Sequence, residues 1–283
     1  MTQLVELQRH VGEFAAAGFA VYAISYDRRD ALSRFADRYG ITYNLLSDEG
    51  SAVIRRFGIL NTIIDPRDPR AQAFYGIPYP GVYVVNEQGV VTEKFFNRHY
   101  ATRTSVGTIL DTALGRVLAR TESPAADART NQVRVQAFLA DRTLTLETTT
   151  TLHVRLQVAA GLHVYGAPLP EGFFPTTVTV RPVQGLRVGT PVFPRTTPRR
   201  FEALRVTLPV YEGVVDVRIP VTRSAPLEQL ASTRSRFGFT GPPTIDVPVV
   251  VDYQACSETI CYRPGSARLT VKVPMGDLVF PRP

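Results

Sequence analysis

The stretch IDVPVVVDYQACSETICYRP, residues 245–264, contains the only two cysteines of this 283-residue chain. Its first eight residues, 245–252, are rich in β-branched side chains and predict a β-strand. Cys256 follows this strand and Cys261 opens the return segment, so that four residues separate them. Four residues is a common length for a hairpin loop. We therefore expect Cys256 and Cys261 to face each other across a β-hairpin.

This spacing allows the two cysteines to form a disulfide. Cα atoms of directly opposed antiparallel residues lie roughly 4.5–5.5 Å apart, within the roughly 4.4–6.8 Å that a disulfide needs. The bond would close so small a ring that the lost chain entropy stabilises the fold by only about 2 kcal/mol. We therefore interpret the pair as one that is reduced and re-formed, while a permanent structural disulfide is the alternative. A metal site is not expected, because two thiolates lack the remaining ligands of a zinc site.

The C-terminal half alternates apolar and polar residues, which is the pattern of half-buried β-strands. Proline and glycine separate these segments at the spacing of a β-sandwich. The predicted strands cover residues 133–139, 144–147, 151–158, 176–183, 204–208, 214–221, 245–251 and 268–273. We therefore expect an all-β domain over residues 132–283.

The N-terminal half has a different period and predicts an α/β layer structure. The nearly unbroken apolar run 19–26 predicts a strand that is buried on both faces of a sheet. The predicted helices cover residues 4–14, 29–39, 51–57 and 102–118, and a predicted hairpin covers residues 81–96. We expect a domain over residues 1–119. A linker over residues 120–131 should follow, because its small polar residues lack periodicity.

The net charge is +7, and arginine supplies nearly all of the basic residues, with Lys94 and Lys272 the only lysines. Clustered basic residues would favour nucleic-acid binding. Here they occur singly or in pairs, so we expect a solvated arginine-rich surface and no nucleic-acid partner. No apolar run reaches the roughly 18–20 residues that span a bilayer, and the first residues lack the pattern of a signal peptide. We therefore expect no membrane insertion.

Three motifs in the N-terminal half resemble one known family. FAVYAISYD (residues 19–27), LLSD (45–48) and IPYPGVYVVNEQG (77–89) are similar to segments of the peroxiredoxin-like AhpC/TSA redoxins. The resemblance implies a thioredoxin-like fold. It also implies a cis proline before the penultimate strand, since cis peptide bonds are largely confined to proline. Pro80 matches this position best, with Pro78 as a rival, and the further alternative is that both prolines are trans in a turn that leads into the strand.

The active-site cysteine of that family has no counterpart in this sequence. By the resemblance, it lies at the end of a central strand, just before the helix that here begins near Met1, and residues 1–255 contain no cysteine. Peroxidase chemistry needs a thiolate, so we do not expect it from this half. We interpret the domain as incomplete in this sequence, lacking its first strands and its cysteine. The loss of a central strand would leave an unpaired gap in the sheet, and natural domains avoid such gaps. A degenerate, non-catalytic binding module is the alternative.

Four motifs in the C-terminal half resemble a second family. HVYG (163–166), PLPEGF (168–173), YEG (211–213) and the cysteine segment are similar to the N-terminal domain of the thiol:disulfide interchange protein DsbD. The resemblance implies an immunoglobulin-like sandwich that works in the periplasm or another extracytoplasmic compartment. It also implies thioredoxin-like or other dithiol/disulfide proteins as partners and a membrane electron transporter as the electron source. No cofactor is implied besides the redox-active disulfide.

The same resemblance assigns catalytic roles to the two cysteines. Cys261 would be the attacking thiol that forms a mixed disulfide with a partner, and Cys256 would resolve it. In this family a mobile cap that carries an aromatic side chain covers the pair, and Phe193 and Phe201 are the candidates here. The favoured function is thiol/disulfide exchange by a thiol:disulfide oxidoreductase. The alternative is a non-catalytic docking protein with a structural disulfide.

Three further residues belong to these motifs. Tyr253 and Tyr262 flank the cysteines, and we expect both to pack around the sulfur atoms. His163 is a candidate base, but it lies far from the cysteines in the sequence. We therefore expect His163 to have a structural, hydrogen-bonding role.

Overall fold

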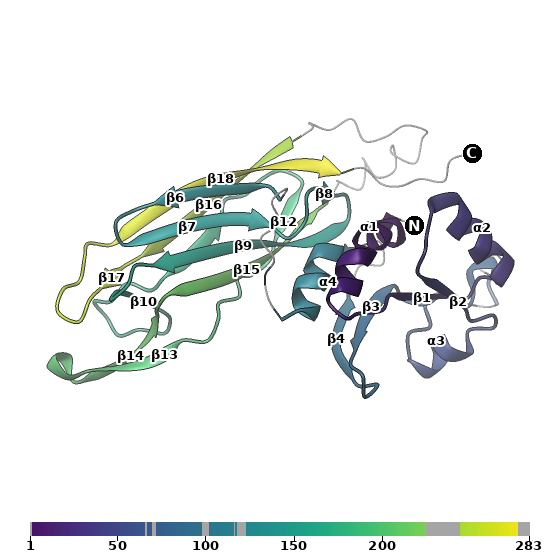
Figure 1. Cartoon of the computed structure of the whole chain (residues 1–283), viewed down its shortest axis with the longest axis horizontal. Helices are drawn as coiled ribbons and strands as arrows, with labels where there is room; N and C mark the ends of the chain where they lie inside the picture. The colour runs from purple at the N-terminus through teal and green to yellow at the C-terminus, as the bar shows by residue number, and fades with distance from the viewer. Residues whose placement is uncertain are drawn as a thin grey trace. The chain divides into compact units, whose positions relative to one another are not determined.

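The computed structural model describes residues 2–65, 67–69, 72–97, 102–115, 117, 123–224 and 244–276 (Figure 1). The chain divides into two compact units. The first contains the described residues up to Val117, and the second contains those from 123 to 276. The described α-helices all lie in the first unit, whereas strands dominate the second. The prediction of an α/β domain followed by a β-rich domain is confirmed.

The first unit alternates helices and strands. Its elements are α1 (Thr2–Ala16), β1 (Tyr22–Ser25), α2 (Arg29–Tyr39), β2 (Asn44–Ser47), α3 (Ala52–Arg56), η1 (Gln72–Phe74), β3 (Gly81–Val85), β4 (Val91–Phe96), β5 (Arg103–Thr104) and α4 (Val106–Ala113). β1 pairs in parallel with β2, and β3 pairs with β4 in the predicted antiparallel hairpin. The last helix, α4, is shorter than the prediction of residues 102–118.

Local interactions fix where two of these helices begin and end. The carboxylate of Asp48 accepts hydrogen bonds from the amides of Val53 and Ile54 at 3.1 and 2.8 Å. These bonds satisfy amides at the start of α3 that have no partner within the helix. α2 ends at Gly40, whose φ of 62° lies in the left-handed region that glycine adopts without strain.

The first unit contains two separate two-stranded sheets, β1–β2 and β3–β4. Within the described residues, no strand pairs with the edge of β1 that faces away from β2. Two side chains on one face of β1 are open to solvent: Tyr22 is 59% exposed and Ile24 is 38% exposed. The prediction of a strand buried on both faces is wrong for this structure, because the face of β1 that carries Tyr22 and Ile24 is exposed.

The second unit consists of three sheets (Figure 1). Its strands are β6 (Ala125–Arg129), β7 (Val133–Leu139), β8 (Leu144–Thr145), β9 (Thr148–Val158), β10 (His163–Tyr165), β11 (Thr177–Val180), β12 (Leu186–Val188), β13 (Thr197–Phe201), β14 (Val206–Tyr211), β15 (Val214–Arg223), β16 (Thr244–Tyr253), β17 (Ala255–Cys256) and β18 (Gly265–Gly276). A short 3-10 helix, η2 (Glu202–Leu204), lies between β13 and β14. The sheets have the strand orders β12-β15-β9-β7-β6, β11-β16-β18-β8 and β13-β14-β10-β17.

The edge strand β6 lies inside the predicted linker. It pairs antiparallel with β7, from Ala125 opposite Phe138 to Arg129 opposite Arg134. The prediction of a linker over residues 120–131 is therefore wrong for residues 125–129. An edge strand can form through backbone hydrogen bonds to one neighbour, so it does not need the bulky β-branched side chains by which central strands are recognised.

One cluster of buried apolar residues forms the core of the second unit. Most of its members lie in the two larger sheets, and Val164, Tyr211 and Ala255 come from the sheet that contains β10, β14 and β17. Inward-facing residues of β16 and β18 are direct cross-strand neighbours, such as Val249 opposite Leu269 and Val251 opposite Ala267. Buried residues also alternate along β9 and β15. β16 leads from this core directly towards the cysteines of β17 and the following loop.

Candidate functional site

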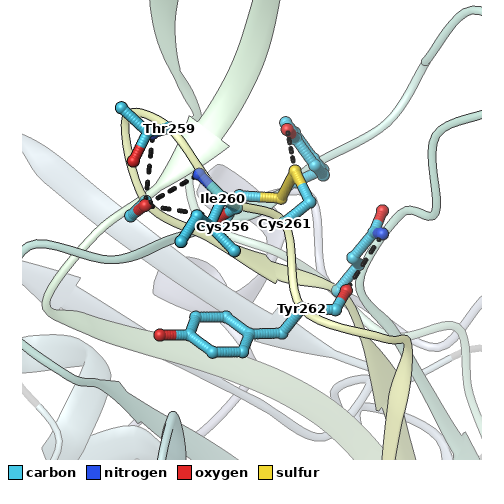
Figure 2. Close-up of a disulfide and its surroundings, with 8 residues drawn as sticks. Cys256, Thr259, Ile260, Cys261 and Tyr262 are labelled. Carbon is cyan, nitrogen blue, oxygen red and sulfur yellow. Dashed lines mark hydrogen bonds between the residues drawn. A yellow bond between two sulfur atoms is a disulfide. The ribbon is translucent and has the colours of Figure 1, made fainter.

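Cys256 and Cys261 form a disulfide across a tight loop (Figure 2). Their Cα atoms are 4.0 Å apart, and the two residues form an antiparallel bridge. The amide of Ser257 donates a hydrogen bond to the carbonyl of Ile260 at 2.8 Å, which closes the loop. The prediction that the cysteines face each other across four residues is confirmed.

Ser257 organises the loop between the cysteines. Its hydroxyl oxygen accepts hydrogen bonds from the amides of Thr259 and Ile260 at 3.2 and 3.0 Å (Figure 2). Bonds from a serine side chain to nearby backbone amides stabilise turns. The local sequence between the cysteines therefore holds the loop in the shape that brings the two sulfur atoms together.

The two cysteines differ in burial. Cys256 is 0% exposed and packs in a small cluster with Tyr165, Leu208 and Val210. Cys261, in contrast, is exposed. A reactant that approaches from solution therefore meets Cys261 first.

The short strand β10 places two side chains with polar atoms beside the disulfide. His163 is directly opposite Cys256 in the pairing of β10 with β17. The hydroxyl oxygen of Tyr165 lies 3.7 Å from Sγ of Cys261. Burial raises the pKa of Tyr165, so the hydroxyl stays protonated at neutral pH and can donate a hydrogen bond to sulfur.

His163 is 0% exposed, and neither of its ring nitrogens has a hydrogen-bond partner. Its ring centroid lies 5.3 Å from that of Tyr165 and 5.2 Å from that of Phe201. The expectation of a hydrogen-bonding role is therefore wrong, because aromatic rings surround the imidazole. Burial lowers the pKa of His163, the Arg199 cation lowers it further, and the Glu212 carboxylate partly opposes both effects. The buried imidazole is consequently neutral at neutral pH.

Two regions of the chain match known protein families. Residues 1–94 match the AhpC/TSA family, and residues 134–272 match the N-terminal family of the thiol:disulfide interchange protein DsbD. The chain joins an AhpC/TSA segment to a DsbD N-terminal segment. Both resemblances inferred from the sequence motifs are thereby confirmed, and we refer to the second unit as the DsbD-type unit.

Curated relatives are peroxiredoxins. The chain is 31% identical to peroxiredoxin Bcp of Escherichia coli over 84 residues, which cover 30% of this chain and 48% of that protein. It is 29% identical to a putative peroxiredoxin of Mycobacterium tuberculosis over 99 residues, which cover 34% of this chain and 57% of that protein. The chain thus spans about half the length of the curated relatives it matches.

Two solved structures are similar to this chain at low identity. The reduced DsbD N-terminal domain of Neisseria meningitidis is 16% identical, with a TM-score of 0.30, and the match covers 57% of this chain and 92% of that chain. The N-terminal periplasmic domain of ScsB from Proteus mirabilis is 13% identical, with a TM-score of 0.35, and the match covers 53% of this chain and 51% of that chain.

Of the two candidate cap aromatics in the DsbD-type unit, Phe201 lies near the disulfide. It packs against the cluster that contains Cys256, and its ring centroid lies 6.4 Å from that of Tyr165. Phe193 instead stacks on Tyr211 with the ring centroids 6.3 Å apart, and it packs against the large core. The structure therefore brings Phe201, but not Phe193, into contact with the cysteine cluster.

Tyr253 and Tyr262 do not surround the sulfur atoms as expected. Tyr253 is buried in the large core, and its hydroxyl lies 2.9 Å from the Thr130 hydroxyl. Tyr262 is 40% exposed, and its ring points away from the disulfide (Figure 2). Residues at odd separations along an extended chain point to opposite faces, so each tyrosine faces away from its nearest cysteine. Tyr165, which the HVYG motif contains, is the tyrosine at the sulfur atoms.

Pro80 does not have the cis peptide bond that the redoxin resemblance implies. The only cis peptide bond within the described ranges joins Ala167 to Pro168. The trans form is the lower-energy state of most bonds that precede proline. Here the amide of Tyr79 donates to the carbonyl of Ile59 at 2.6 Å, so the segment enters β3 in an extended, hydrogen-bonded form. The prediction for Pro80 is therefore wrong.

A charged cluster ties the loop between the cysteines to β13. Arg199 forms ion pairs with Glu258 in that loop and with Glu212 after β14. The Arg199 guanidinium also lies 5.9 Å from the ring centroid of Phe201. The Arg199–Glu258 pair thus connects the loop to β13, whose last residue, Phe201, packs against the cluster that contains Cys256.

The side chains at the disulfide offer two sulfur atoms, an imidazole and a phenol for chemistry. Among the residues that the structure describes, no group of three or more His, Cys, Asp or Glu side chains could hold a metal ion. No helix in those same ranges is long and apolar enough to cross a membrane.

We expect the Arg199–Glu258 ion pair to slow reduction of the disulfide by restraining the loop. Glu258→Gln should accelerate reduction by dithiothreitol, and Arg199→Gln should do the same. Exposed ion pairs contribute about 0.2–1 kcal/mol, which corresponds to an acceleration of up to about fivefold. The rates are measured by trapping free thiols at successive times.

The double variant tests whether the effect belongs to the pair. Arg199→Gln combined with Glu258→Gln should be no faster than the faster single variant, since the second change removes a partner that is already lost. Arg200→Gln is the matched control, because Arg200 is the next residue of β13 and pairs with Glu202 instead. Additive single effects would contradict a role for the ion pair.

The buried His163 should make stability depend on pH. Its pKa is lower in the folded state than its usual value of about 6.5, so the unfolded chain binds the proton more readily. The free energy of unfolding should therefore be fully retained above about pH 6.5 and fall as the pH decreases towards the folded-state pKa. Urea unfolding of the oxidised protein measures this slope. The slope should be smaller in His163→Phe, which keeps an aromatic ring but cannot be protonated.

Proposed function

We propose that the DsbD-type unit exchanges disulfides with dithiol proteins through Cys256 and Cys261, as a thiol:disulfide oxidoreductase. The observation that carries this proposal is the difference in burial between the two cysteines. Cys261 is exposed to a partner, whereas Cys256 lies behind it with 0% exposure. The match of residues 134–272 to the DsbD N-terminal family supports the same function.

The proposed reaction begins with the reduced pair. The Cys261 thiolate attacks one sulfur of a partner disulfide, forms a mixed disulfide and releases the other partner sulfur as a thiolate. The Cys256 thiolate then attacks Sγ of Cys261 and releases the second partner sulfur. The partner gains two electrons and becomes a dithiol, while the Cys256–Cys261 disulfide is the oxidised product. Every step can run in reverse with a reducing partner.

Tyr165 and Phe201 have proposed supporting roles in this reaction. The protonated Tyr165 hydroxyl, 3.7 Å from Sγ of Cys261, can stabilise the negative charge that develops on that sulfur. Phe201 packs against the cysteine cluster and is our candidate for the cap aromatic. It would limit access of solvent to the buried sulfur.

The family match also supports proposals about fold and setting. We assign the DsbD-type unit an immunoglobulin-like sandwich, because most residues of its single large apolar core lie in two facing strand sets, β12-β15-β9-β7-β6 and β11-β16-β18-β8. We place its activity outside the cytoplasm, where disulfides persist. Its partners would be thioredoxin-like or other dithiol proteins and a membrane electron transporter. Residues 1–255, which include the AhpC/TSA segment, contain no cysteine, so within this chain the proposed exchange depends on Cys256 and Cys261.

Trapping with single-cysteine variants tests the assigned roles. Cys256→Ser should accumulate a mixed disulfide with a thioredoxin-like partner, because the resolving thiol is missing. Cys261→Ser should accumulate little, because the remaining thiol is buried. Non-reducing electrophoresis followed by mass spectrometry measures both. Equal trapping by the two variants would remove the basis for naming Cys261 the attacking thiol.

The reduction potential distinguishes exchange from the alternative of a docking protein with a structural disulfide. Structural disulfides have potentials below about −300 mV, whereas labile ones lie higher. We expect a potential above that value, because the bond closes a small ring and one sulfur is exposed. Equilibration with glutathione or dithiothreitol buffers measures it. A potential below about −300 mV would favour the structural alternative.

A further inference from the structure

The buried imidazole of His163 is the strongest unexplained feature of the DsbD-type unit. It is 0% exposed, and both ring nitrogens are without a hydrogen-bond partner. Buried polar groups in folded proteins almost always have such a partner, so an exception calls for a physical explanation. A role in folding alone would be served as well by a phenylalanine, because the neighbours of His163 include the rings of Tyr165 and Phe201.

The position of His163 relates it to one sulfur in particular. In the antiparallel pairing of β10 with β17, His163 is directly opposite Cys256. Directly opposed residues project to the same face of a sheet with their Cβ atoms roughly 4.5–5.5 Å apart. The imidazole and the Cys256 side chain are therefore neighbours. In the disulfide form Cys256 carries no proton, so the imidazole has nothing to accept from it.

Reduction changes this situation, because it leaves a thiol on Cys256. A thiolate is needed to resolve the mixed disulfide, but burial in apolar surroundings raises the pKa of a thiol above its usual value of about 8.5. Cys256 is 0% exposed, so forming its thiolate calls for a nearby group that takes up the thiol proton. A neighbouring neutral base would overcome this obstacle.

We propose that His163 is the proton acceptor for Cys256 in the resolving step. The inference rests on the proposed function. In the mixed disulfide, the proton of the Cys256 thiol passes to an imidazole nitrogen of His163. The resulting thiolate attacks Sγ of Cys261, the sulfur–sulfur bond to the partner breaks, and the partner leaves as a thiolate. The imidazolium then returns its proton to that thiolate or to solvent, so that charge and atoms balance.

The charged groups around His163 support this assignment. Arg199 on β13 disfavours the imidazolium and Glu212 after β14 favours it, while burial is the largest effect and keeps the pKa below its usual value. Tyr165, on the same strand, stays protonated and so adds no charge. Glu258 faces Arg199 from the loop. His163 therefore enters the reaction in the neutral form that can accept a proton.

The test measures the resolving step directly. The reduced protein is mixed with oxidised glutathione, the reaction is quenched with acid, and the mixed disulfide is followed by mass spectrometry. His163→Phe and His163→Gln should both resolve it more slowly near neutral pH, by about 10²-fold, which is typical of the loss of a general base. The difference in resolution rate between the variants and the wild type should become smaller at higher pH, because hydroxide then deprotonates the thiol without the imidazole. His163→Gln guards against a packing defect peculiar to phenylalanine.

Two controls separate a chemical role from a structural one. His153→Phe is matched, because His153 is also buried but stacks on Phe138 with ring centroids 5.2 Å apart. It should leave the pH profile unchanged. In a Cys256→Ser background, His163→Phe should leave the rate of mixed-disulfide formation unchanged, since only resolution uses the base.

The outcomes distinguish this inference from the proposed function. If the wild type exchanges with glutathione and the His163 variants follow the same pH profile, the proton-acceptor role is overturned and the exchange function stands. If the reduced wild type forms no mixed disulfide at any pH, the exchange function itself fails. Only one outcome supports the inference: both His163 variants resolve the mixed disulfide more slowly than the wild type, and the difference depends on pH.

Discussion

The antiparallel register of β16 with β18 is the constraint on which the site depends. It runs from Thr244 opposite Pro274 to Tyr253 opposite Gly265. Because side chains alternate between faces, a slip of one residue would turn the valines of β16 out of the core, so burial fixes the register firmly. The register in turn fixes where the chain leaves the sheet. β17 can therefore pair with β10 and bring Cys256 opposite His163.

The parts of the site that depend on nearby residues could be predicted from sequence. The facing of Cys256 and Cys261 follows from a strand and a loop of four residues, and the structure has that arrangement. The place of His163 could not be predicted this way, because β10 and β17 are far apart in the chain and no local pattern specifies their pairing. The sequence also does not distinguish Phe193 from Phe201 as the cap aromatic, because distant strands decide how both segments pack.

The fold shows the same division between local and distant causes. Helix ends such as Gly40 depend on the conformation of one residue, and they lie where the sequence indicates. The sequence does not predict β6, because its alanines and polar residues have no alternating apolar pattern. β6 forms a strand because it pairs antiparallel with β7. The apolar run that contains Tyr22 correctly indicates a strand. Its burial depends on which elements pack against each face of its sheet, which the periodicity of one segment does not report.

The separation of two apolar clusters would allow this unit to change redox state, as the proposed exchange requires. The large core between the sheets does not include Cys256, which packs instead with Tyr165, Leu208 and Val210. The disulfide closes a ring too small to stabilise the fold by more than about 2 kcal/mol. Breaking it therefore alters a peripheral cluster and a loop held by its own hydrogen bonds, while the inter-sheet core remains packed. We therefore expect the fold to accommodate both the dithiol and the disulfide, as the proposed exchange requires.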